Sequence, residues 1–249
     1  MSEEAAPDEI PAPRKLTVAS LGATPALTAL VGIAWISNQA YQEGFALEQH
    51  LFGFGVLVWV MGLTFAVAVS IVVAFVGILA LTPKTGRQRF LQAAGVSSML
   101  GLIGAFGSFC TTFGPYEKGT HAGYRALELA PYQEAAESLR AWLKEQPEPR
   151  QQRGRVFDPD AKGWQEAPAK LRELPRKIAQ AAVGPKGVTI CLQGGYKQPY
   201  AGLYFPAEGQ GPPQDPGIET FPLAEGVHYV SIRKRYTDSS ELVGAKGLE

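Results

Sequence analysis

The sequence has few residues of the kinds that carry metal or thiol chemistry, and it has no net charge. Two cysteines and three histidines occur in 249 residues, and no two of these five stand at zinc-ligand spacing. The 23 basic residues balance the 23 acidic ones, so nothing favours a nucleic-acid partner. The pair Gly194-Gly195 precedes a strand pattern and not a helix, so it does not form a phosphate-binding loop. We therefore expect no metal, cofactor or nucleic acid.

A second absence, that of charge, defines the first half of the chain. Three stretches contain no Asp, Glu, Lys, Arg or His: Leu16–Ser37, Leu51–Thr82 and Phe90–Phe113. A helix needs about 20 apolar residues to cross the hydrocarbon core of a bilayer. The stretches therefore predict three transmembrane helices (16–37, 51–82 and 90–113), and Pro25 is expected to kink the first. A cleavable signal at 16–37 and a buried hairpin in a soluble protein are the weaker interpretations.

The uncharged helices also limit what the membrane region does. Proton relays, ion-coupled transport and voltage sensing need ionisable side chains held at depth in the membrane, and these three stretches hold none. A pore assembled from several copies and lined by Thr64, Ser70 or Ser97 remains as an alternative.

Basic residues in the short connections predict the orientation. Arg14 and Lys15 precede the first stretch, and the turn at 83–89 contains Lys84, Arg87 and Arg89, whereas residues 38–50 contain no Lys or Arg. Basic loops remain on the cytoplasmic side. Residues 1–15, acidic and rich in Ala and Pro, are accordingly predicted to be a disordered cytoplasmic tail, and residues 114–249 to lie outside the cytoplasm.

Small residues recur at every fourth position in the second and third stretches. Residues four apart share one helix face, and small side chains let two helices approach closely in lipid. We expect the two stripes to face each other across the 83–89 turn. The helix-packing residues are Gly62, Ala66, Ser70, Ala74, Ala93, Ser97, Gly101 and Ala105.

Residues 114–249 predict a small α+β domain. After a linker at 114–130, helical periodicity covers 131–146 and again 167–183, where Pro175 is expected to bend or divide the second helix. Strand patterns cover 188–193, 200–205, 219–223 and 227–236. The expected fold is thus two helices on a mostly antiparallel sheet, with a loop at 207–217 and a frayed tail from 237.

Few side chains in the chain are candidates for chemistry. Cys191 and His228 are the one thiol–imidazole combination of the C-terminal domain, although a cysteine inside a strand is usually part of a core. A disulfide between Cys110 and Cys191 is compatible with an extracytoplasmic domain. His50 and His121, at the expected outer interface, are candidate ligands for a haem or a pigment.

The expected protein is a multi-pass membrane protein with an extracytoplasmic, periplasmic α+β domain and no catalytic site. We interpret it as an accessory or scaffold subunit of a bacterial inner-membrane complex, such as an energy-transducing assembly, with lipids and other membrane subunits as its partners. The alternative is an envelope sensor or ligand-binding protein that uses its extracytoplasmic domain.

Overall fold

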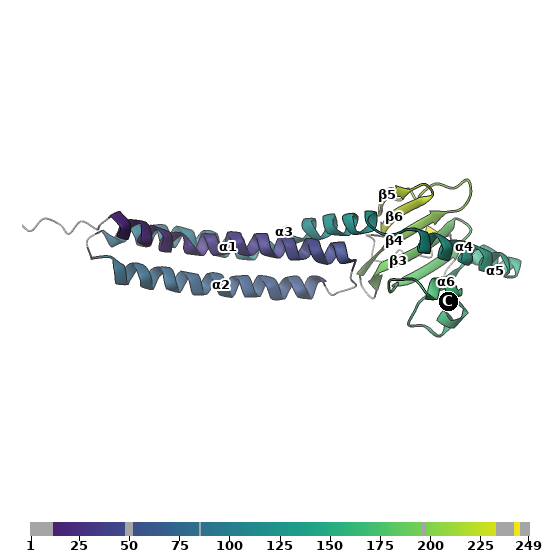
Figure 1. Cartoon of the computed structure of the whole chain (residues 1–249), viewed down its shortest axis with the longest axis horizontal. Coiled ribbons are helices and arrows are strands. Elements are labelled where there is room, and N and C mark those ends of the chain that lie inside the picture. The colour runs from purple at the N-terminus through teal and green to yellow at the C-terminus, as the bar shows by residue number, and fades with distance from the viewer. Residues whose placement is uncertain (1–11, 48–51, 85, 196–197, 233–241, 245–249) are drawn as a thin grey trace, which may run out of the picture. The chain divides into compact units, whose positions relative to one another are not determined.

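A computed structural model describes residues 12–47, 52–84, 86–195, 198–232 and 242–244 (Figure 1). The chain divides into two compact units, the first drawn from Met1–Ala46 and His50–Thr120 and the second from Leu47–Gln49 and His121–Glu249. We call them the membrane-helix unit and the C-terminal unit. The boundary falls inside a helix, a little beyond the expected change of domain at residue 114.

Three long helices make up the membrane-helix unit: α1 (Ala12–Ala46), α2 (Phe52–Leu81) and α3 (Arg87–Arg125) (Figure 1). All three are long and apolar enough to cross a membrane, which confirms the three predicted helices. The predicted tail was wrong for residues 12–15, because these begin α1, with Pro13 in its first turn, where a missing N–H is harmless. Residues 1–11 lie outside the described part of the chain.

Helices α1 and α3 both continue past the ends of their uncharged stretches. Helix α1 reaches Ala46, and α3 runs to Arg125 although it contains Pro115. The predicted linker at 114–130 is therefore helical over most of its length. The physical reason is packing: Gly44 lies against the carbonyl of Tyr116, and Gly119 lies against the carbonyl of Tyr41. Close backbone approach between the two extensions stabilises turns that the local sequence alone would not favour.

Glycines bring α1 close to both other helices. Gly32 of α1 lies against the side chain of Leu63 in α2, and Gly101 of α3 lies against Pro25 of α1. A Cβ atom at Gly101 would stand 2.8 Å from the Pro25 carbonyl oxygen. The buried cluster at this level joins all three helices and contains Ala29, Ile36, Leu63, Val67 and Ala105.

The C-terminal unit contains a six-stranded antiparallel sheet in the order β1-β2-β3-β4-β6-β5 (Figure 1). Its strands are β1 (Arg155–Phe157), β2 (Gln180–Gly184), β3 (Gly187–Gly195), β4 (Gln198–Pro206), β5 (Ile218–Ala224) and β6 (Val227–Ile232). The four predicted strands correspond to β3, β4, β5 and β6. The turn at Ala224-Glu225-Gly226 joins β5 to β6, with Gly226 at φ +68°.

One face of the sheet carries the main hydrophobic core, and α4 (Ala130–Lys144) covers it. Helix α4 starts with Pro131 in its first turn, where proline is tolerated, and its buried residues Tyr132, Ala135 and Leu139 recur at helical spacing. On the sheet side Ile190, Leu203 and other alternate residues of β2, β3, β4 and β6 enter the same core. Helix α4 therefore confirms the first predicted helix of the domain.

The opposite face of the sheet is covered in part by residues 242–244. Leu242 and Val243 are buried there, in a cluster with Tyr204, Val230 and Ile232. The backbone N–H of Lys186 donates a hydrogen bond to the carbonyl of Val243 at 3.0 Å. The prediction of a frayed tail was wrong for this segment, because two apolar side chains find a second apolar surface on the sheet.

The second predicted helix, at 167–183, was also wrong. Only α6 (Ala169–Arg172) is helical there, and residues 180–184 form β2 instead. Two neighbouring strands decide this outcome: Ala181 pairs with Ile190, and Ala182 pairs with both Val156 and Thr189. Ladder hydrogen bonds and burial outweigh the helix propensity of alanine. Between the two predicted helices lie α5 (Glu148–Arg153), β1 and a 3₁₀ helix, η1 (Lys162–Glu166).

Candidate functional site

The eight predicted helix-packing residues divide into a buried and an exposed group. Ser70, Ala74, Ser97, Gly101 and Ala105 are buried, whereas Gly62, Ala66 and Ala93 are exposed. We expected the two stripes to contact each other. Instead, Ser97 and Gly101 of the α3 stripe contact the turn of α1 around Pro25. The short 83–89 turn therefore does not by itself decide which residues of α2 and α3 face each other.

The exposed part of the α2 stripe borders a groove between α1 and α2. The groove measures about 460 Å³, and Gly62 and Ala66 form its floor together with Thr28, Val31 and Trp35. A Cβ atom at Gly62 would meet no atom within 4 Å. At one end, the rings of Trp35 and Trp59 pack edge to face with centroids 6.2 Å apart. This surface presents small side chains to the exterior of the described helices.

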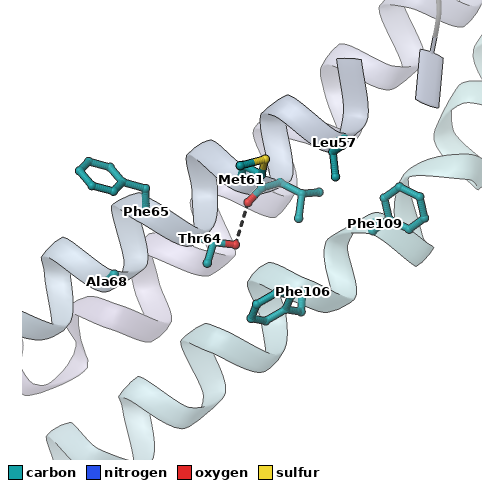
Figure 2. Close-up of a pocket in the computed structure, with 8 residues that line it drawn as sticks. Leu57, Met61, Thr64, Phe65, Ala68, Phe106 and Phe109 are labelled. Atoms are coloured by element: carbon teal, nitrogen blue, oxygen red, sulfur yellow. Dashed lines mark hydrogen bonds between the residues drawn. The ribbon is translucent and has the colours of Figure 1, made fainter. Parts of the chain in front are cut away.

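A larger groove of about 650 Å³ lies between α2 and α3 (Figure 2). Large apolar side chains line it, among them Leu57, Met61 and Phe65 of α2 and Phe106 and Phe109 of α3. Its one hydroxyl, that of Thr64, donates a hydrogen bond to the carbonyl of Val60 at 2.8 Å, drawn as the dashed line in Figure 2. The groove can therefore bind hydrocarbon and offers no unpaired side-chain donor to an ion.

The hydroxyl groups inside the helices bond to nearby backbone. Ser70 donates to the carbonyl of Val67 at 2.7 Å, and Ser108 donates to that of Ala105 at 2.6 Å. Ser97 differs, because it accepts a bond from the N–H of Ala26 on another helix at 3.1 Å. The three side chains named for a pore, Thr64, Ser70 and Ser97, thus all have partners within the membrane-helix unit.

In the C-terminal unit, the end of α3 packs on two aromatic side chains of the sheet, Phe221 of β5 and Tyr229 of β6. The α3 residues in these contacts are His121, Tyr124 and Arg125. The imidazole of His121 has its centroid 4.9 Å from that of Phe221 and 5.2 Å from that of Tyr229. Its Nε2 atom lies 3.4 Å from a carboxylate oxygen of Glu219. The ring of this candidate ligand is therefore engaged in packing within the domain. His50 lies outside the described residues.

The thiol and imidazole candidates do not form a catalytic pair. Cys191 in β3 pairs with Gly202 of β4, whereas His228 in β6 pairs with Tyr204 of β4. Strand β4 thus separates the two residues, and two strand spacings amount to about 9.6 Å. That distance prevents His228 from taking a proton from the thiol. Burial lowers the pKa of His228 below its ordinary value.

The two cysteines form no disulfide in the structure. Cys110 is exposed on α3, and Cys191 is buried in β3.

Comparison with protein-family models, curated proteins and solved structures finds no match.

Proposed function

We propose that this protein is a non-catalytic accessory or scaffold subunit of a bacterial inner-membrane complex, possessing a helix face that docks another membrane subunit. The face is defined by Val58, Gly62, Ala66, Val69 and Val73 of α2, and we call it the α2 docking face. These residues follow one another at helical spacing, and all five are exposed.

The open position of Gly62 carries this proposal. Several other glycines of the bundle serve close contact: Gly101 meets the backbone of Pro25, and Gly119 meets that of Tyr41. Gly62 has no such neighbour among the described residues, although glycine inside a helix costs about 1 kcal/mol relative to alanine. In lipid, small residues favour association by letting two helices approach closely. A partner helix lying over Gly62 and Ala66 offsets that cost.

The proposed orientation places the N-terminus in the cytoplasm and the C-terminal unit in the periplasm. It is supported by the basic residues near the start of α1 and at the α2–α3 turn. Cysteines introduced at Lys84 and at Asp160, in a Cys110→Ser background, test it by labelling with a membrane-impermeant maleimide. Labelling of the Asp160→Cys variant alone in intact spheroplasts is expected, and labelling of the Lys84→Cys variant alone would reverse the orientation.

Purification from native membranes in a mild detergent tests the docking face. We expect the wild-type chain to bring down a membrane subunit in fixed proportion, and Gly62→Leu with Ala66→Leu to lose it. Gly95→Leu is the matched control, because a Cβ atom at Gly95 would also meet no atom within 4 Å, but this glycine lies on α3. A wild-type chain that purifies as a lone monomer contradicts the proposal.

A further inference from the structure

We propose that the groove between α2 and α3 binds one acyl chain of a membrane glycerophospholipid as a resident ligand. The inference concerns a surface of α2 different from the docking face: Leu57, Met61 and Phe65 border this groove, whereas Gly62 and Ala66 border the groove beside α1. It stands independently of the proposed function.

The length of the groove matches one leaflet of a bilayer. Its α2 lining runs from Leu57 to Ala68, which at about 1.5 Å per residue amounts to roughly 16 Å. The hydrocarbon core is about 30 Å thick, so one leaflet contributes about half of that thickness. The lining residues of α3, Phe106 and Phe109, come from the second half of the uncharged stretch 90–113. In an antiparallel pair they stand level with the first half of α2.

The groove closes near the middle of the helices. At Gly101 a Cβ atom would stand 3.1 Å from Cγ1 of Val67, so α2 and α3 are in contact there. Leu63, Val67 and Ala105 belong to the buried cluster at this level. Leu57, at the opposite end of the lining, is 47% exposed. The contact between α2 and α3 at Val67 therefore limits the groove at its inner end.

This shape selects a hydrocarbon chain over a transmembrane helix. A helix with side chains is about 10 Å wide and crosses the whole core, so it occupies roughly 2,400 Å³, against about 650 Å³ in the groove. A crossing helix would also meet the contact between Gly101 and Val67. The volume lies within the range of roughly 300–1,000 Å³ in which proteins hold single small ligands.

The lining chemistry agrees with that choice. Aromatic and thioether side chains give dispersion contacts to an alkyl chain, and these contacts are the main attraction available within lipid. The Thr64 hydroxyl is already bonded to the carbonyl of Val60, so burying an apolar chain leaves no donor unsatisfied. The groove needs no polar group from its ligand.

Photolabelling tests the proposal. The full chain is reconstituted in nanodiscs of palmitoyl-oleoyl phosphatidylglycerol and phosphatidylethanolamine that contain a phospholipid with a diazirine in its acyl chain. Irradiation and mass spectrometry then map the labelled residues. We expect the exposed groove residues Met61, Phe65 and Phe106 to carry at least fivefold more label than Val72 and Val76, which are comparably exposed positions of α2 outside the groove.

Ala68→Phe fills the groove and should reduce this preferential labelling to the level of Val72, whereas Ala80→Phe, at an exposed alanine of α2 outside the groove, should preserve it. Even labelling of wild-type groove and control positions overturns the proposal. Cross-links from Met61 or Phe106 to a second polypeptide also overturn it, since they identify a protein as the occupant. Neither result bears on the docking face, which the Gly62→Leu variant tests separately.

Discussion

The hydroxyl oxygen of Ser97 in α3 accepts a hydrogen bond from the backbone N–H of Ala26 in α1 at 3.1 Å. Ala26 follows Pro25, whose ring disturbs the regular hydrogen bonding of a helix. Membrane helices tolerate proline when a neighbouring side chain satisfies the freed backbone groups. Four residues along α3, Gly101 gives the carbonyl of Pro25 room to approach. Two residues of one small-residue stripe thus accommodate one proline.

Replacing Ser97 with alanine should destabilise the membrane-helix unit by about 0.5–1.5 kcal/mol, because the N–H of Ala26 loses its acceptor. Ser98→Ala is the matched control: Ser98 is also buried, but it donates to the carbonyl of Ala94 in its own helix. Unfolding in mixed detergent micelles, followed by circular dichroism, measures the difference. Equal losses for the two variants would show that the bond between the helices contributes nothing.

Gly101→Val should destabilise the same unit by about 1–3 kcal/mol, since the added side chain must displace the backbone of Pro25 and the side chain of Val67. Gly95→Val, at a position where a Cβ atom meets nothing within 4 Å, should change stability by less than about 0.5 kcal/mol. The same unfolding measurement compares them. A tolerated Gly101→Val would mean that α1 and α3 are not in close contact in the membrane.

Tyr124→Phe should cost the C-terminal unit about 1–2 kcal/mol, because the buried hydroxyl donates to the carbonyl of Ala201 at 2.8 Å. The contact between Lys170 and Glu134 is equally short, at 2.8 Å, but both side chains are more than half exposed. Glu134→Gln should therefore leave the midpoint of thermal unfolding unchanged. A larger effect from Glu134→Gln than from Tyr124→Phe would contradict this ranking by burial.

Removal of residues 242–249 should lower the unfolding midpoint of the C-terminal unit by several degrees. The deletion uncovers the cluster of Tyr204, Val230 and Ile232, and it removes the acceptor of the Lys186 N–H. Deletion of residues 245–249 alone is the matched control, since it retains Leu242 and Val243. Identical midpoints for the two truncated chains would show that this segment does not stabilise the sheet.

The stability of the C-terminal unit should depend on His228 at mildly acidic pH. Burial lowers the pKa of His228 in the folded state, whereas in the unfolded chain it returns to about 6.5. The unfolded state therefore binds more protons between these two values, so the free energy of unfolding falls as the pH drops below about 6.5. His228→Gln should flatten this slope between pH 7.5 and 5. An unchanged slope in thermal or urea unfolding would refute the assignment to His228.

The predictable features of this chain are those that depend on single residues or on local periodicity. Long uncharged stretches indicate the membrane helices because lipid excludes ionised side chains. The β-branched and aromatic residues of 188–193 and 200–205 indicate two central strands. The Pro131 start of α4 is also visible in the sequence. In each case the signal and the structure depend on residues within one segment.

The errors occurred where a segment's structure depends on a distant partner. Residues 180–182, Gln-Ala-Ala, are helix formers, yet they belong to β2 because strands β1 and β3 supply ladder partners on both sides. The groove between α2 and α3 was likewise missed, because the sequence indicates that Met61 and Phe106 face lipid but not that they line one groove together. Cys191 and His228 were candidates until the strand register separated them.

The sequence by itself determined which half of the chain is surrounded by lipid and which by water. The free-energy cost of placing a charge in lipid is large, and it depends on each charged residue alone. Only the tertiary structure decided which small residues meet another helix and which remain open. Close contact requires two surfaces, and the surface that meets Gly101 is the backbone around Pro25, 76 residues earlier in the chain. Gly62 is also a glycine in a stripe of small residues, and it differs from Gly101 in having no such neighbour among the described residues.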